Sequence, residues 1–382
     1  MKLIISSLRI ENFRSLKRLE LENLARVNLI TGRNNTGKSS LLEALRIMAS
    51  DAAPSMLNAI ARNREEDYSE SEDSTRGAES EGLLQIGSLF TGFPQVADIR
   101  EPIVLEAPGN DRALGLSLSV KFFTEERQED GSKKFVPQQP ELFPSEGLMP
   151  PDGLIAALVT ERTGRARRVI PVDLLKRSYL RNRIWRLEVP EEVGLPCAFV
   201  SSYGNERTSN VGHLWDKIAL SDLENDIVDA LQLISPDIMA VSMVGVEGNR
   251  THRTAIVKSS RFPRPIPLRS YGDGLNRLFS IALSLVNAKG GLLLIDEFEN
   301  GMHHTVQLDV WKAIFRLSTA LNIQVFATTH SWDAVRTFQE AAAADPEEGS
   351  LIRLARYDDI IVPTIFREDE LAIVTRESVE VR

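Results

Sequence analysis

One eight-residue motif restricts the fold of this chain more than any other feature. Residues 32–39 read GRNNTGKS and match GxxxxGK[ST], the pattern of phosphate-binding loops. The apolar run VNLIT precedes the motif, and SSLLEALRIMAS, apolar at helical spacing, follows it from Ser39. A strand, a glycine loop and a helix in this order predict an α/β domain whose loop and helix N-terminus bind phosphate.

Each residue type in this loop has a chemical role in a nucleotide site. The two glycines let the backbone curve around phosphate groups, the lysine reaches the β- and γ-phosphates, and the serine hydroxyl binds Mg²⁺. The alternative is a glycine-rich turn that carries an exposed lysine. The predicted nucleotide-binding residues are Gly32, Asn34, Asn35, Thr36, Gly37, Lys38, Ser39 and Ser40.

Two further apolar runs end in polar residues. LLLI at 292–295 is followed by Asp296 and Glu297, which predicts a buried strand whose first acid holds Mg²⁺ and whose second activates water as a general base. The alternative is a solvated acidic turn. QVFATT at 324–329 is followed by His330, either a helix cap or a γ-phosphate sensor at the carboxyl end of a strand.

Composition narrows the class of protein. The chain has 382 residues with 42% apolar and 26% charged side chains and a net charge of −9, which is typical of a folded protein of two or three domains. A single cysteine excludes an intrachain disulfide and a cysteine-rich zinc site. We find neither a membrane-spanning run nor a signal peptide, and we predict a cytoplasmic protein.

The middle of the chain changes character several times. The segment 64–82 is strongly acidic and predicts a solvated loop, whereas 103–123 alternates like strands. The basic stretch Arg162–Arg186 predicts either a nucleic-acid or phosphate contact or a solvated helix face. Later elements are predicted as helices at 213–245, 274–288 and 305–321 and as strands at 250–257, 291–296 and 323–329.

The order of these motifs resembles the head of ABC-type ATPases, most closely the SMC/RecF group and the OLD-like ATPases. The similar segments are LRIENFRSLKRLEL with VNLITGRNNTGKSSLLEAL, SYGDGLNRLFSIALSLVNAKGGLLLIDEFENGMHH, and QVFATTHSWDAV. They cover residues 1–50 and 265–335, and the segment between them corresponds only by position, as an insertion. The sequence SYGDG departs from the LSGGQ of transporters, which argues against a transporter head.

The resemblance implies a specific site. In that family two heads enclose two ATP molecules, and a Ser-x-Gly loop, here Ser270 and Gly272, contacts the γ-phosphate bound by the other head. His330 corresponds to the switch histidine, and Asn300 to His303 correspond to the loop that crosses the dimer interface. A glutamine contacts Mg²⁺ and water in the family, and Gln85 or Gln95 would take that place.

The resemblance also implies an architecture and leaves several functions open. We expect an ABC-type core in residues 1–60 and 265–382 with an N-terminal antiparallel β subdomain. The inserted segment at 61–264 is expected to contain the acidic loop, β strands and a basic, mainly helical lobe. Too few residues follow His330 for a Toprim nuclease domain, so we expect no nuclease centre in this chain.

The function predicted from the sequence is a Mg²⁺-dependent ATPase that switches a homodimer. It would serve as the ATPase component of a prokaryotic, anti-phage defence system and gate a separate effector protein. One alternative is a RecF-like DNA-binding ATPase of repair or recombination. Another is a non-catalytic ATP-sensing scaffold, against which the glutamate at 297 argues.

Overall fold

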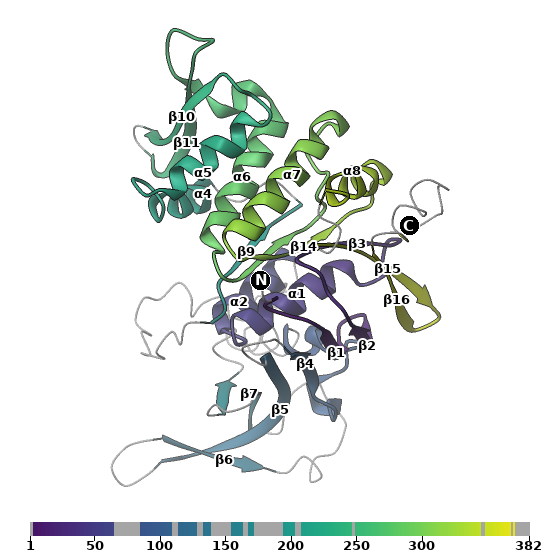
Figure 1. Cartoon of the computed structure of the whole chain (residues 1–382). Helices are drawn as coiled ribbons and strands as arrows, with labels where there is room; N and C mark the ends of the chain where they lie inside the picture. The colour runs from purple at the N-terminus through teal and green to yellow at the C-terminus, as the bar shows by residue number, and fades with distance from the viewer. Residues whose placement is uncertain are drawn as a thin grey trace.

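The computed structural model describes most of the chain. The residues described are 3–64, 85–108, 114–127, 133–138, 154–162, 167–171, 194–202, 208–246, 249–344, 348–367 and 370. Their strands form three sheets: one of six strands at the centre, one of seven, and one of three (Figure 1).

The six-stranded sheet carries the nucleotide motifs. Its strands in spatial order are β16 (Ile360–Phe366), β15 (Gly349–Tyr357), β3 (Val27–Thr31), β14 (Gln324–Thr328), β13 (Leu292–Ile295) and β9 (Cys197–Val200). All neighbours pair in parallel except β15 and β16. In register, Ile30 lies opposite Thr328 and Ala327 lies opposite Ile295, so β3, β13 and β14 end at the same edge.

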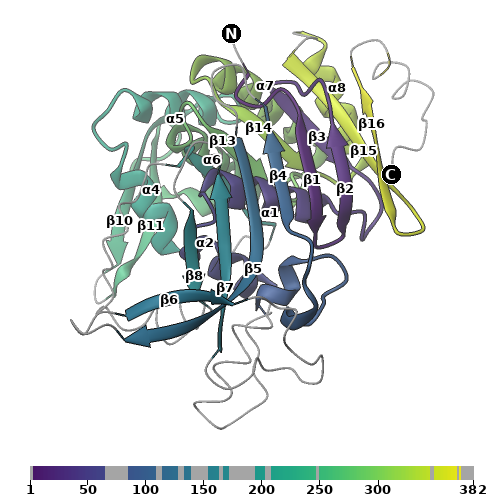
Figure 2. The same cartoon turned by 90° about the horizontal axis from the view of Figure 1, so that it is seen from below.

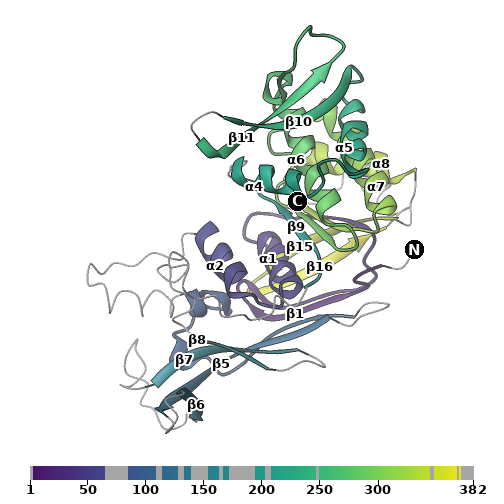
Figure 3. The ribbon, with the colours of Figure 1, turned by 90° about the vertical axis from the view of Figure 1, so that its left-hand side faces the viewer.

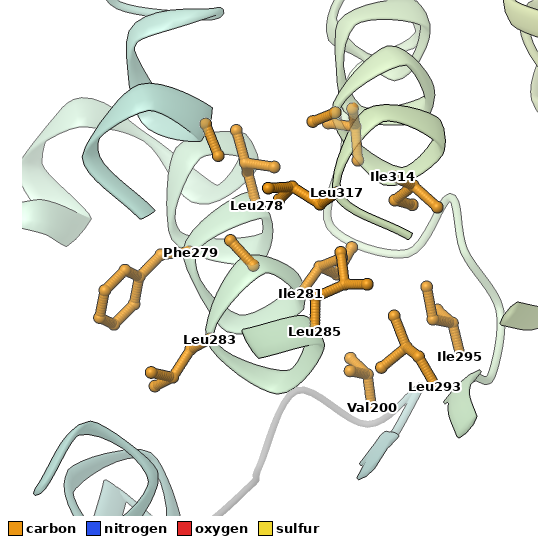
Figure 4. Close-up of a cluster of buried hydrophobic side chains, with 14 of the residues drawn as sticks. Val200, Leu278, Phe279, Ile281, Leu283, Leu285, Leu293, Ile295, Ile314 and Leu317 are labelled. Atoms are coloured by element: carbon orange, nitrogen blue, oxygen red, sulfur yellow. The ribbon is translucent and has the colours of Figure 1, made fainter. Parts of the chain in front are cut away.

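Both faces of this sheet are covered, which explains its unbroken apolar strands. Along β13 the side chains alternate between two cores: Leu292 and Leu294 join one, and Leu293 and Ile295 join the other. Figure 4 shows the second core, where Leu293 and Ile295 meet side chains of two covering helices. These helices are α6 (Asp273–Asn287) and α7 (His304–Ala320), and α8 (Trp332–Ala342) lies beside α7.

The first core lies between the central sheet and an antiparallel sheet, which Figure 2 shows face on. Helix α1 (Lys38–Ala49) fills the space between the two sheets, and nearly all of its residues are buried (Figure 3). This sheet confirms the predicted N-terminal antiparallel β structure. Its strands are β1 (Leu8–Phe13), β2 (Leu16–Leu21), β4 (Ile103–Ala107), β5 (Leu114–Arg127), β6 (Lys133–Gln138), β7 (Leu154–Arg162) and β8 (Arg168–Pro171).

The remaining described elements are short. One group packs against α6 on the far side of the central sheet: α4 (Thr208–Asp216), α5 (Leu223–Gln232), β10 (Ile238–Val246), β11 (Asn249–Ser259), β12 (Ile266–Pro267) and the 3-10 helix η4 (Leu268–Tyr271). Helix α2 (Pro54–Asn63) follows α1, and the 3-10 helix η1 (Val96–Asp98) precedes β4. None of the helices in the described part of the chain has the length and apolar character needed to cross a membrane.

The inserted segment, in which a mainly helical lobe was expected, contains more strand than predicted. The predicted helix at 213–245 is two helices followed by β10, because IMAVSMVGV pairs along its length with β11. The basic stretch also begins in strands, since Arg162 ends β7 and Arg168 begins β8. Residues 172–193 of that stretch, and residues 65–84 of the acidic loop, lie outside the described residues.

The boundaries of the expected insertion remain a proposal. Two strands from within it pair with strands of the expected core. Strand β9 comes from within 61–264 but forms the edge of the central sheet beside β13. Strand β4, also from that segment, pairs with β1 of the N-terminal part. Over its described residues, the middle of the chain is therefore shared between both sheets.

Candidate functional site

The phosphate loop follows β3 directly and has a backbone that only glycine adopts easily at two positions. Gly32 has φ +147° and Gly37 has φ +86°. A Cβ on Gly32 would lie 2.3 Å from the carbonyl oxygen of Leu354 in β15, and one on Gly37 would lie 2.6 Å from the Leu16 side chain. The loop is thus pressed against β15 and the β1–β2 turn, and Lys38 begins the helix behind it.

This packing gives a first prediction. Gly32→Ala forces a side chain into backbone atoms of β15, so the loop must move, and ATP affinity should fall at least about tenfold. Gly245→Ala in β10 is the control, because nothing lies within 4 Å of its Cβ position. Titration with a fluorescent ATP analogue measures both variants; equal affinity for Gly32→Ala and wild type would contradict the described loop.

The lysine of the motif folds back over the loop. Its Nζ donates hydrogen bonds to the carbonyl oxygens of Gly32 at 2.7 Å and Arg33 at 2.8 Å, and the Thr36 hydroxyl donates to the same Arg33 oxygen at 2.8 Å. Burial lowers the pKa of Lys38 to about 8, against the opposing pull of Asp296, Glu297 and Glu299. The loop is thus closed by its own side chains, with a cation at its centre.

The acidic pair lies directly at the end of β13. One carboxylate oxygen of Asp296, Oδ1, accepts a 2.8 Å hydrogen bond from the Thr328 hydroxyl, which itself accepts the backbone N–H of Glu297 at 2.9 Å. Glu297 has a left-handed φ of +47°, a costly conformation for this residue that tends to occur at functional sites. Both acids are only partly buried, so their carboxylates remain accessible.

The histidine follows β14 and is partly buried. Its backbone N–H donates to Glu299 Oε1 at 2.8 Å. Burial and the positive charge of Lys38 lower the pKa of His330 below its ordinary value, against the opposing effect of Glu297, Glu299 and Asp296. Ser331, not His330, caps α8, because its hydroxyl accepts the N–H of Ala334 at 3.4 Å. This removes the helix-cap alternative for His330.

The loop before α6 is exposed at both of its predicted contact residues, Ser270 and Gly272. Gly272, with φ +106°, directly precedes α6 as its N-cap residue. Tyr271 anchors the loop by donating its hydroxyl to Asp237 at 2.8 Å. From the same helix, Arg277 donates to the carbonyl oxygens of Ser201 at 2.8 Å and Asp296 at 3.2 Å, which ties α6 to the acidic pair.

The segment after the acidic pair is exposed at Asn300 and His303, whereas Met302 between them is buried. Asn300 donates its side-chain amide to the carbonyl oxygen of Ser202 at 2.5 Å and lies 3.5 Å from Glu297 Oε2. His303 caps α7 through a ring nitrogen that accepts the Thr305 N–H. Asn300 and His303 are both accessible to solvent.

The residues present fit a Mg²⁺ ion bound together with nucleotide. Ser39 is exposed at the start of α1, and Asp296 Oδ2 accepts no hydrogen bond from the described part of the chain. In the same described residues no group of three His, Cys, Asp or Glu side chains is placed to hold a metal ion. Mg²⁺ normally binds one or two protein ligands, substrate phosphates and water, so two ligands suffice here.

At three of the predicted nucleotide-site positions the structure shows contacts within the chain instead. Ser40 is buried, and its hydroxyl lies 3.3 Å from that of Ser15 in the β1–β2 turn. Gln85 is buried beside Ser88, whose hydroxyl donates to its backbone carbonyl. Gln95 starts the 3-10 helix η1. A nucleotide contact by Ser40, Gln85 or Gln95 stays a prediction.

Sequence reasoning did not identify three residues that hold the site together. Arg277, Thr328 and Glu299 link the ends of β13 and β14 and the start of α6 through hydrogen bonds. These three residues lie far apart in the sequence, and no motif or spacing pattern identifies them as parts of one site.

A family model described as "AAA domain, putative AbiEii toxin, Type IV TA system" matches residues 27–335. The chain belongs to this family. An ATP/GTP phosphatase of Helicobacter pylori is 24% identical over 389 residues, covering 96% of this chain and 97% of that protein. An uncharacterised protein of Methanocaldococcus jannaschii is 33% identical over 95 residues, which are 25% of this chain and 82% of that protein.

Among solved structures, an SMC head bound to the C-winged helix domain of ScpA overlays with a TM-score of 0.48 at 12% identity. The overlay covers 95% of this chain and 98% of that one. The family match covers the phosphate loop, the acidic pair and the histidine in one span. The predicted P-loop ATPase domain is confirmed by the match to an AAA family, and the mixed α/β fold with an antiparallel sheet is confirmed by the structure.

Proposed function

We propose that this family member hydrolyses ATP at the common end of β3, β13 and β14. The observation that carries the proposal is the meeting of a lysine-bearing phosphate loop with two acids and a histidine at one sheet edge. Asp296, Glu297 and Glu299 lie near enough to Lys38 to oppose the lowering of its pKa by burial. Release of phosphate from ATP, measured with and without Mg²⁺, tests this function.

The residues divide the reaction between them. Lys38 leaves the carbonyl oxygens of Gly32 and Arg33 and binds the β- and γ-phosphates, while the loop N–H groups bind the remaining oxygens. Ser39 and Asp296 would hold Mg²⁺, which would neutralise charge that develops on the phosphates. Glu297 takes a proton from the attacking water, and the imidazole of His330 faces the γ-phosphate.

We further propose that ATP closes a homodimer. Exposure of Ser270 and Gly272 supports this, because neither residue is used by a contact that buries it within its own chain. Exposure of Asn300 and His303 supports it equally. Contacts to the γ-phosphate exist only before hydrolysis, so binding and hydrolysis would shift the population between closed and open dimers.

A role in prokaryotic defence, through a separate effector protein, is the biological function we favour. The family description names a putative AbiEii toxin of a type IV toxin–antitoxin system. Affinity purification of Glu297→Gln with ATP and Mg²⁺ from its own host tests the partner. A second protein in equal amounts supports the gated effector, and nucleic acid without protein contradicts it.

Direct DNA binding through the basic stretch is the second candidate, favoured by nine basic residues against two acidic ones at 161–186. The described arginines are, however, engaged within the chain. Arg162 and Arg168 lie 3.5 Å and 3.6 Å from the carboxylate of Asp51, and Arg167 lies 3.6 Å from Glu161. Such pairing reduces the charge available to phosphates.

We therefore expect Arg167→Glu to change the affinity for duplex DNA by less than about twofold, the same as the exposed control Arg336→Glu on α8. Fluorescence anisotropy with a labelled duplex at two salt concentrations measures both. A loss for Arg167→Glu of about tenfold or more, with a reduced salt dependence, would favour the DNA-binding function instead.

A further inference from the structure

The segment after β13 and the segment after β14 are joined by a continuous set of hydrogen bonds. The N–H of Phe298 donates to the carbonyl oxygen of Thr328 at 2.8 Å. The Thr328 hydroxyl bridges the Glu297 N–H and the Asp296 carboxylate. The acidic pair and the strand before His330 therefore move as one unit.

Glu299 completes this connection with both of its carboxylate oxygens. Oε2 accepts the Thr329 hydroxyl at 2.7 Å, and Oε1 accepts the backbone N–H of His330 at 2.8 Å. Both distances are typical of hydrogen bonds to an ionised acceptor, which are about twice as strong as neutral ones. Thr329 is fully buried, and its hydroxyl oxygen also accepts the Ser331 N–H at 3.0 Å.

The backbone around His330 is thus held from both sides. The N–H of Thr329 donates to the carbonyl oxygen of Ile30 in β3, just before the phosphate loop, while the N–H of His330 donates to Glu299. Ser331 then starts α8. With these partners fixed, the direction in which the His330 side chain leaves the backbone depends on where the Glu299 carboxylate lies.

We infer that Glu299 is a positioning residue for ATP hydrolysis, which holds His330 toward the phosphate loop and couples it to the segment Asn300–His303. Glu299 precedes Asn300 directly, so a shift of that segment moves the carboxylate that holds His330. The inference rests on the proposed function, because it assigns to Glu299 an effect exerted through His330. No contact of Glu299 with nucleotide is required.

The decisive test is a double-mutant cycle between Glu299 and His330. Glu299→Gln keeps the size of the side chain, but its amide offers one acceptor oxygen in place of two. We expect kcat to fall about tenfold with the KM for ATP unchanged within about twofold, since ground-state binding belongs to other residues. His330→Ala should lower kcat about 100-fold, and the double variant should match His330→Ala within about twofold.

Two further variants separate positioning from folding. Thr329→Ser keeps the hydroxyl that donates a hydrogen bond to Glu299 and should retain near wild-type kcat. Thr329→Val removes that hydrogen bond and should lower kcat as Glu299→Gln does. Glu340→Gln, an exposed glutamate on α8, is the control and should leave kcat unchanged. Thermal unfolding of each variant establishes that the compared proteins are folded.

The outcomes also distinguish the inference from the function on which it rests. Loss of kcat in His330→Ala together with wild-type kcat in Glu299→Gln overturns the role of Glu299 alone. Multiplied losses in the double variant overturn it as well, because Glu299 would then act independently of His330. Wild-type kcat in His330→Ala contradicts the proposed role of the histidine itself.

Discussion

Glu297→Gln is expected to bind ATP with near wild-type affinity and to hydrolyse it about 10²–10⁴ times more slowly. The amide has the shape of the carboxylate but cannot take a proton from water. The backbone of residue 297 should keep its left-handed conformation, because its N–H donates to Thr328 and its carbonyl oxygen accepts from Arg277. The loss should therefore appear in kcat and leave KM nearly unchanged.

Phosphate release under saturating ATP measures this effect, and equilibrium titration with an ATP analogue measures binding. The matched control is Glu340→Gln on the exposed face of α8, which makes the same chemical change away from the site. Normal turnover in Glu297→Gln would contradict the assignment of Glu297 as the general base. Loss of binding together with turnover would instead indicate that Glu297 maintains the structure of the loop.

Lys38→Ala should weaken ATP binding at least about 100-fold, equivalent to about 2.8 kcal/mol. Lys38 provides the buried cation at the centre of the phosphate loop, and charge-assisted hydrogen bonds to phosphate are among the strongest that a side chain makes. Its removal also leaves the carbonyl oxygens of Gly32 and Arg33 without the Nζ donor that they share. Hydrolysis should fall below detection at ATP concentrations that saturate the wild type.

The control for this variant is Lys312→Ala on the exposed side of α7. It removes the same charge from the chain at a site away from the phosphate loop. The comparison therefore shows whether the loss of ATP binding comes from the missing side chain or from the change in net charge. Isothermal titration of both variants with ATP and Mg²⁺ gives the comparison. Binding by Lys38→Ala within about threefold of wild type would contradict the proposed position of the phosphates.

The parts of the site that lie at strand ends were predictable from the sequence. A phosphate loop must follow a strand and start a helix, and parallel strands that end together bring their following residues together. The sequence predictions of β3, β13 and β14 and of the helices α6 and α7 are confirmed within a few residues. Lys38, Asp296, Glu297 and His330 lie at one edge because of these local patterns.

The rest depends on contacts between distant segments, which no local pattern encodes. The sequence of β10 reads equally well as a continuation of α5, and only its pairing with β11 makes it a strand. Strand β9 is four residues long and gains its place from β13, almost 100 residues later. Arg277 and Glu299 act through backbone groups of other elements, so their roles appear only in three dimensions.

We propose that two copies of the chain enclose the ATP that is hydrolysed at this site. The most direct test is the rate of phosphate release per chain, measured with ATP and Mg²⁺ over a wide range of protein concentrations. We predict that the rate per chain rises with concentration, reaches a plateau, and is abolished in Ser270→Arg, whose side chain would obstruct the partner's γ-phosphate. A rate per chain that is independent of concentration, or no phosphate release at any concentration, would contradict the account.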